Sequence, residues 1–537
     1  MATEQLPVVI VGAGPVGLGL AIDLAQRQVP SIVVERYALP RPLPKGQNLT
    51  QRTIEHLHAW GVASAVDAAR LIPKSFGIAG LTAYGTLLGP YTHDWFKRGR
   101  VGAYYAQEND RLPQYETERI LRERAAEFDA ISTYYGWSAD AFEASDTGAK
   151  VHIRTHRGTD ERTLAARYVI GCDGAQSSVR QHAAMAETRE DHNRLMVLVV
   201  FRSRALHELL ERYPGKSYFN IINTEMDGYW QFFGRVDLGE HWFFHAPVPF
   251  GTNAENFDFS ALLCAAVGQE FDHEIQHLGF WDLRIASVNN YRDGVFFVAG
   301  DAAHSHPPYG GFGINTGFED ARNLAWKLAG QYAGWAGPGL LDSYSAERQP
   351  VFVSTGRDFI GRMIEDDRAF VRAYDPLRNQ AEFEAAWHER SKGGDADVLG
   401  FVPNYVGSPL VEGAEEGSPS ARGTHEFRAR AGHHLAPQSW SDGRKVFSAL
   451  SADFSLLALD ADACDVEKLV RAARALDLPL KVLQDTRADG RELYGAKLVL
   501  VRPDQFVAWA GDAAPTDALA LLRGCIGFSG YAQSPPL

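Results

Sequence analysis

The chain has 537 residues, of which 45% are hydrophobic and 11% aromatic, and its net charge is −14 at pH 7. This length accommodates two or three domains, each with a sizeable core. The acidic balance, without basic runs, argues against nucleic acid or an anionic membrane as the main partner. No apolar stretch approaches the roughly 20 residues of a membrane helix. The opening sequence MATEQLP does not resemble a signal peptide.

Cysteine usage points to a reduced compartment. The four cysteines are far apart and form no CxxC motif. Neither a disulfide framework nor a metal site is therefore indicated. A cytoplasmic location fits this pattern.

A glycine-rich turn near the amino end predicts a dinucleotide site. Residues 8–11 (VVIV) are a short apolar run, typical of a buried parallel strand, and residues 16–27 are expected to form the next helix. The turn between them contains Gly12, Gly14 and Gly17. The first permits the tight turn, the second lets backbone N–H groups approach a pyrophosphate, and the third lets the helix pack closely. Glu35, at the end of a second strand, can accept hydrogen bonds from a ribose.

Two further turns follow predicted strands. Asp173 comes directly after the apolar run 168–171, and Arg180 is spaced to hold the turn and to meet a phosphate or carboxylate. An ordinary turn is the alternative there. Asp301 follows the strand 295–299, and a loop rich in proline and glycine then leads into a helix over 316–329. The N–H groups at the start of that helix can stabilise negative charge.

The pattern of elements predicts a mixed α/β chain, with a Rossmann-like dinucleotide-binding domain, a sheet domain for substrate and a small C-terminal α/β domain. The first domain, with a helical extension, takes residues 1–75, 111–182 and 291–400. The sheet domain, antiparallel and rich in aromatic residues, takes 76–110 and 183–290. A linker is expected at 404–424, and the last domain at 425–537.

The chain resembles the class A, single-component flavoprotein aromatic hydroxylases of the para-hydroxybenzoate hydroxylase fold. More narrowly, it is similar to their three-domain branch, which includes phenol, chlorophenol, 3-hydroxyphenylpropionate and polyketide hydroxylases. The shared segments are GAGPVG (12–17), QRTIE (51–55), QYETERIL (114–121), CDGAQSSVR (172–180), GDAAH…PPYGGFGINTG (300–317), LLDSYSAERQP (340–350) and LVRPDQFVAW (500–509).

The resemblance implies FAD as cofactor, NADPH or NADH as reductant with NADPH favoured, and O2 as co-substrate. The residues that would hold FAD are Gly12, Gly14, Gly17, Glu35, Arg36, Gln114, Asp173, Asp301, Pro308, Gly311, Gly313, Ile314 and Asn315. The last domain would be thioredoxin-like, but without a CxxC motif it cannot perform dithiol chemistry. Packing or oligomerisation is its expected role, and the resemblance is compatible with a homodimer.

The implied reaction inserts one oxygen atom into a phenolic or other electron-rich aromatic ring through a flavin C4a-hydroperoxide. His306 is the best titratable candidate for an acid–base group, although it can instead satisfy loop backbone. Gln47 stands where relatives often have His or Asp. An amide cannot act as a base, but Gln47 can orient a hydroxyl or a water.

Alternation along residues 229–245 predicts a substrate-facing set on one side of a strand. That set is Tyr229, Gln231, Phe233 and Arg235, with Trp230, Phe232 and Gly234 on the opposite face. Simple sheet packing is the alternative, and Arg235 either meets a substrate carboxylate or is solvated. Tyr309 replaces a threonine common in relatives, which makes the mouth beside the flavin bulkier.

Other functions on the same fold stay open. A flavoprotein oxidase or dehydrogenase would not insert oxygen, and a larger antibiotic-like polycycle would fall within the same reaction class. A flavin-dependent halogenase should carry a Trp-x-Trp-x-Ile-Pro signature, which is absent from the sequence. A non-catalytic FAD-binding protein is a further alternative.

Overall fold

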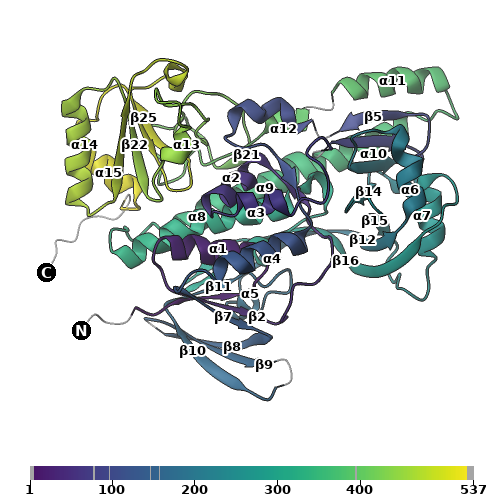
Figure 1. Cartoon of the computed structure of the whole chain (residues 1–537), viewed down its shortest axis with the longest axis horizontal. Coiled ribbons are helices and arrows are strands. Elements are labelled where there is room, and N and C mark those ends of the chain that lie inside the picture. The colour runs from purple at the N-terminus through teal and green to yellow at the C-terminus, as the bar shows by residue number, and fades with distance from the viewer. Residues whose placement is uncertain are drawn as a thin grey trace.

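The computed structural model describes residues 5–76, 79–95, 97–145, 147–155, 158–393 and 396–528. The outermost residues of the predicted first and last domains, 1–4 and 529–537, lie outside this description. The fold is mixed α/β, as predicted, with a small C-terminal domain beside a larger body (Figure 1). Among the described residues, no helix combines the length and the apolar character needed to cross a membrane.

A six-stranded sheet forms the centre of the cofactor-binding part. Its order is β17 (Arg292–Asp293), β18 (Phe296–Val298), β11 (Tyr168–Gly171), β1 (Val8–Val11), β2 (Ser31–Glu35) and β7 (Ile131–Tyr135). All neighbours from β18 to β7 are parallel. The strands predicted from the apolar runs 8–11 and 168–171, and the second strand that ends at Glu35, are therefore confirmed.

The two faces of this sheet are covered differently. Val8 and Ile10 point toward the helices α1 (Pro15–Gln26), α4 (Gln114–Ala125) and α8 (Gly313–Ala333). Val9 and Val11 point to the opposite face and pack against a second sheet. That sheet, which the sequence did not predict separately, consists of β8 (Trp137–Ser145), β9 (Gly148–Thr155) and β10 (Glu161–Ala166).

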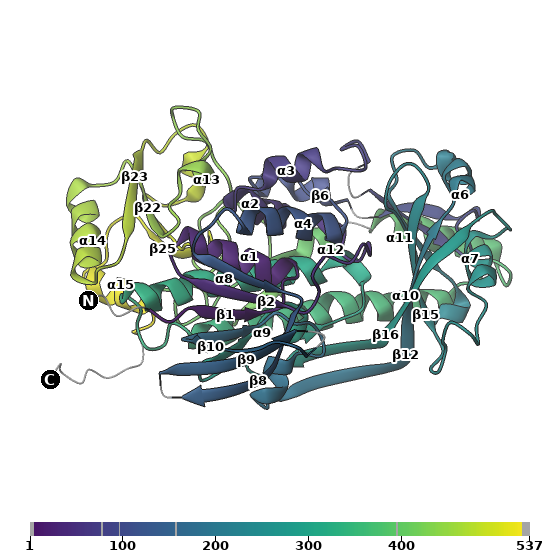
Figure 2. The same ribbon diagram turned by 60° about the horizontal axis from the view of Figure 1, so that its bottom comes forward.

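A third, eight-stranded sheet extends to the far end of the molecule (Figure 2). Its order is β19 (His304–Ser305), β16 (Glu274–Val288), β12 (Glu187–Arg202), β15 (His241–Val248), β14 (Gln231–Arg235), β13 (Tyr218–Ile222), β4 (Gly80–Tyr84) and β5 (Thr92–Trp95). The β4–β13 pair is parallel and the other pairs are antiparallel. One face packs under α6 (Arg204–Leu209) and α7 (Phe259–Val267) in an apolar core.

A helical region follows α8 and leads to the last domain. It comprises α9 (Asp342–Thr355), α10 (Arg362–Ala373) and α11 (Gln380–Lys392). The predicted linker 404–424 is packed rather than free. Leu410 is fully buried, and β21 (Ser420–Arg422) pairs with β20 (Phe401–Asn404).

The C-terminal domain has one mixed sheet. Its order is β23 (Leu480–Asp485), β22 (Phe454–Leu459), β24 (Leu498–Val501) and β25 (Val507–Gly511). The helices α14 (Ala463–Ala475) and α15 (Ala518–Cys525) cover one face. Trp326 and Trp335, at the end of α8 and just beyond it, belong to the same core, so the domain is anchored on α8 (Figure 1).

Buried ion pairs reinforce this junction. Glu347 accepts hydrogen bonds from Lys327 of α8 at 2.7 Å and from Arg502 of the C-terminal domain at 2.6 and 2.8 Å. All three side chains are completely buried. Although burial raises the pKa of Glu347, Arg502 and Lys327 hold it far below its usual range.

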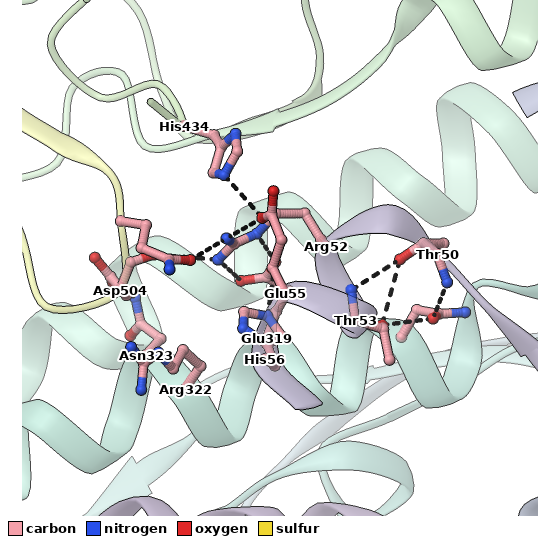
Figure 3. A network of polar contacts seen from close by, with 12 residues as sticks. Thr50, Arg52, Thr53, Glu55, His56, Glu319, Arg322, Asn323, His434 and Asp504 are labelled. Atoms are coloured by element: carbon pink, nitrogen blue, oxygen red, sulfur yellow. Dashed lines mark hydrogen bonds and ion pairs between the residues drawn. The ribbon is translucent and has the colours of Figure 1, made fainter. Parts of the chain in front are cut away.

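A second cluster joins α2 (Gln51–Ala59) to the same junction (Figure 3). Arg52 donates to Glu319 of α8 at 2.8 Å and to Glu55 at 2.7 Å. It also donates to the backbone carbonyl of Asp504 at 3.1 Å, and His434 lies 3.1 Å from Glu55. The QRTIE segment is thus a structural bridge between domains.

Replacing Glu347 with Gln should strongly destabilise the protein. The amide removes the carboxylate partner of the buried Lys327 and leaves Arg502 with Asp504 as its remaining counter-charge, which costs about 3–5 kcal/mol of unfolding free energy. Chemical denaturation of purified variants measures this loss. Glu389→Gln removes the partner of Lys392 on an exposed surface of α11 and should leave the unfolding free energy unchanged. Equal effects of the two variants would contradict the structural role.

Candidate active site

A cavity of about 1550 Å³ runs between the six-stranded sheet and the eight-stranded sheet. The loops that follow β1, β2, β11 and β18 form one wall. The opposite wall is an aromatic patch on the larger sheet, formed by Tyr218, Trp230, Phe232, Phe243, His245 and Trp281. The cavity therefore joins the predicted cofactor loops to the predicted substrate domain.

The first glycine turn opens onto this cavity. Gly12 has φ +105°, and a Cβ there would lie 2.3 Å from the carbonyl oxygen of Cys172. Gly14 is the N-cap of α1 without a side-chain cap, and its Cβ position is open space. Gly17 does not line the cavity; a Cβ there would lie 2.1 Å from the oxygen of Gly12. The turn is therefore tight, and the N-terminus of α1 is accessible to an anion.

Glu35, Arg36 and Gln114 lie on the same wall. The Glu35 carboxylate accepts from the backbone N–H groups of Ala13 and Tyr37, each at 2.8 Å. Gln114, at the start of α4, accepts from the N–H of Gly46 and donates to Glu118. These side chains fix the edges of the loop region at which an adenosine half would bind.

The middle motif connects two cofactor loops. Asp173 lines the cavity and accepts from the backbone N–H and the hydroxyl of Ser178 at 2.7 and 2.9 Å. Arg180 donates to the carbonyl of Ala302 at 3.0 Å and to that of Ala175 at 2.7 Å. Arg180 thus holds the middle turn against the downstream one.

The downstream loop rests on a buried carboxylate. Asp320 of α8 accepts from the N–H of Gly300 at 3.0 Å and lies 2.7 Å from His304. Arg348 donates to its other oxygen at 2.7 Å. Asp301 itself projects into the cavity, and desolvation raises its pKa. The support below the loop leaves the Asp301 carboxyl available to a ligand.

The N-terminus of α8 is the second helix end that faces the cavity. Gly313 and Ile314 line it together with Pro308 and Gly311, and no side chain caps the helix. Asn315, predicted to touch the cofactor, points instead into the protein. It accepts from the N–H of Thr50 at 2.9 Å and donates to the carbonyl of Asn48 at 2.8 Å. Its side chain fastens the 48–53 segment to α8.

These features fit FAD. Two uncapped helix N-termini open onto one cavity, and each favours negative charge. At the first end, Gly12 and Gly14 leave room for a backbone-bound pyrophosphate. At the second, Gly311 has φ +64° and a Cβ on it would lie 2.5 Å from the side-chain nitrogen of Asn48, so this turn requires glycine.

His306 lies at the second helix end. Its Nδ1 donates to the carbonyl of Pro307, which leaves Nε2 as an acceptor. Nε2 has no hydrogen-bond partner and lies 3.7 Å from the point that a Cβ on Gly313 would occupy. Burial lowers the pKa of His306 to about 4, so the ring is neutral at pH 7.

Gln47 also lines the cavity and is held from behind. Its side-chain oxygen accepts from Arg111 at 2.7 Å, and its Nε2 is buried without a partner. Arg111 lies 4.6 Å above the ring of Tyr218 in the aromatic patch. Gln47 is therefore oriented as a donor toward the cavity, consistent with the predicted orienting role.

The predicted substrate-facing set lies on the wrong face of the sheet. Phe233 packs in the core under α6 and α7, and Arg235 packs over the ring of Trp242. Tyr229 and Gln231 do not line the cavity either. Each face of β14 carries a phenylalanine, Phe233 on one and Phe232 on the other, so alternation separated the two faces correctly but could not tell which one is open.

Tyr309 is likewise set back from the cavity. Its hydroxyl accepts from the backbone N–H of Trp230 at 3.0 Å, and the two rings lie 4.6 Å apart. Tyr309 therefore supports a wall residue instead of lining the cavity itself. The sequence did not single out His245, which does line it; the alternation of Phe243 and His245 along β15 was the available signal.

Comparison with known proteins agrees with this site. Residues 5–355 match the family model described as FAD binding domain, and residues 429–527 match the one described as aromatic-ring hydroxylase, C-terminal. The 4-methyl-5-nitrocatechol 5-monooxygenase of Burkholderia sp is 31% identical, covering 96% of this chain and 97% of that protein. The 12-dehydrotetracycline 5-monooxygenase/anhydrotetracycline 6-monooxygenase of Streptomyces rimosus is 30% identical, covering 95% and 97%.

Solved structures show the same architecture over nearly the whole chain. The rebeccamycin biosynthetic enzyme RebC with reduced flavin aligns with a TM-score of 0.82 and 26% identity, covering 97% of this chain and 99% of that one. A ternary complex of aklavinone-11 hydroxylase with FAD and aklavinone aligns with a TM-score of 0.81 and 25% identity, covering 98% and 100%. The chain therefore belongs to the FAD-dependent aromatic-ring hydroxylases.

Proposed function

We propose that this hydroxylase uses NAD(P)H and O2 to hydroxylate a phenolic substrate with more than one fused ring. The observation that carries the proposal is the continuity of the cavity from the two helix N-termini to the aromatic patch. When bound, FAD supplies the redox chemistry that accepts reducing equivalents and activates oxygen.

The protein's own contribution is to orient the ring and to exclude water. Trp230, Phe232 and Phe243 offer aromatic faces on which a planar ring can stack. Gln47, fixed by Arg111, presents a donor to an oxygen substituent. At the α8 N-terminus, backbone N–H groups stabilise negative charge that develops beside them.

Cavity size supports the larger substrate. A site for one small ligand usually measures about 300–1000 Å³. The cavity here measures about 1550 Å³ and includes both the cofactor loops and the aromatic patch, so it exceeds the space of one such ligand. The two relatives described above are named for a substituted catechol and for tetracyclic compounds, so both sizes occur on this fold.

A substrate panel tests the proposal. Holoenzyme is supplied with NADPH or NADH, O2 and phenol, 1-naphthol, 1,8-dihydroxyanthraquinone or anhydrotetracycline. We expect a fused-ring member to stimulate reductant oxidation and to yield a product heavier by one oxygen atom, measured by mass spectrometry. Oxidation that gives only H2O2 with every compound would instead support an oxidase.

Gly14→Asp should separate cofactor binding from stability. The Cβ position is open and aspartate is a favoured N-cap, so the apoprotein should unfold within about 0.5 kcal/mol of wild type. The added carboxylate would occupy the helix end and repel a pyrophosphate, so FAD affinity should fall about 100-fold or more. Flavin titration measures the affinity, and Gly14→Ala serves as the uncharged control. Unchanged affinity in the Asp variant would place the dinucleotide elsewhere.

The pH profile should carry no step from His306. Its pKa of about 4 lies below the unfolded value of roughly 6.5, so the ring is protonated only in acid and stays neutral from pH 6 to 9. His306→Gln keeps a hydrogen-bonding group and should give a kcat profile parallel to that of wild type over this range. A step near pH 6–7 in wild type that the variant lacks would assign acid–base catalysis to His306.

A further inference from the structure

His245 occupies the middle of the aromatic patch. It lies on β15, directly opposite Leu198 of β12 on one side and Phe232 of β14 on the other. Side chains in one cross-strand row share a face of the sheet. Leu198 and Phe232 both line the cavity, so the register places His245 on the cavity face.

The surroundings of His245 are almost entirely aromatic. Its ring centroid lies 5.3 Å from that of Phe243, 5.4 Å from Trp281 and 6.3 Å from Phe232. The residue is 6% exposed, and its Nδ1 has no hydrogen-bond partner among the described residues. Buried polar atoms are normally paired, so this nitrogen marks a place where a ligand completes the hydrogen bond.

The protonation state of the His245 imidazole limits which ligand groups can form a hydrogen bond with Nδ1. Burial lowers the pKa of His245 to about 4, although a contact with the backbone carbonyl of Val197 acts in the opposite direction, so the imidazole is neutral at pH 7. A neutral imidazole nitrogen either donates or accepts, depending on the tautomer. A hydroxyl group serves both tautomers because it can accept and donate. An aliphatic group would leave Nδ1 unpaired, and a carboxylate would lose hydration against the three aromatic rings around His245.

We infer that His245 is the substrate-binding residue that recognises a ring hydroxyl, seated between Phe243, Trp281 and Phe232. This deepens the proposed function and rests on it, because the same cavity must accept the aromatic ring. Gln47 and His245 come from different walls, a loop and the sheet, so two polar contacts orient one planar substrate. Neither removes the phenolic proton as a strong base.

The test uses holoenzyme and isothermal titration calorimetry. The ligand is the tightest-binding hydroxylated compound among phenol, 1-naphthol, 1,8-dihydroxyanthraquinone and anhydrotetracycline, compared with 1,8-dimethoxyanthraquinone. His245→Phe preserves an aromatic ring without nitrogen and should raise the Kd of the hydroxylated ligand about 10-fold. The Kd of the dimethyl ether should stay within about twofold. His245→Gln restores a polar group and should recover most of the affinity.

His93→Phe is the matched control. His93 lies at the far end of the same cross-strand row, opposite Thr82, and does not line the cavity. The control should bind as wild type does. FAD content confirms that each variant is folded.

If wild type hydroxylates a panel member and His245→Phe binds it unchanged, the inference fails and the function stands. If wild type binds without hydroxylating any, while His245→Phe weakens binding, the function fails and the inference stands. Absence of binding by wild type overturns both.

Discussion

The structure depends on one helix, α8, whose charged residues are buried or nearly buried along its length. Its N-terminus must remain open to the cavity, while the turns behind it carry Glu319, Asp320 and Lys327. A buried charge is costly unless it is paired and hydrogen-bonded. Glu319 pairs with Arg52 of α2, whereas Asp320 and Lys327 both pair with residues of α9, so the ion pairs fix α8 against these two helices. Because α8 is held by ion pairs at both the cofactor loop and the C-terminal domain, these two parts of the molecule are fixed relative to each other.

This arrangement favours specificity over stability. Apolar residues of equal volume often stabilise a core as well as buried ion pairs do. Their contacts are not directional, however, so they allow packed elements to shift relative to each other. Asp320 shows what the pairs secure: one carboxylate holds Gly300, His304 and Arg348 together. The loop that carries Asp301 and His306 is therefore positioned by Asp320 and Arg348, neither of which lines the cavity. A C-terminal domain without redox cysteines has a clear role here, because Arg502 completes the charge balance.

Short sequence motifs predicted the strands and turns well, whereas contacts between residues far apart in the sequence could not be predicted. The turn at Gly12 was readable because glycine, a buried strand and Glu35 all lie within one short segment. The hydrogen bonds of the Asn315 side chain could not be predicted because its partners, Thr50 and Asn48, are far away in sequence. Arg235 looked free to meet a substrate, yet it is covered by the helix α6 and the ring of Trp242. Which face of an apolar strand is open depends on such coverings.

Arg235 lies on the covered face of β14, so it cannot bind a substrate carboxylate in the cavity, and this changes the charge expected of the substrate. With Arg235 behind the sheet, a carboxylate placed on the aromatic patch would lose its hydration against Phe232, Phe243 and Trp281. A neutral hydroxylated ring loses much less, since stacking replaces water over its faces and His245 or Gln47 can meet its oxygen atoms. The patch therefore discriminates through the cost of unpaired polar groups more than through the area of contact. Under the proposed function, this cost favours phenolic rings over benzoate-like acids as substrates that bind on the patch.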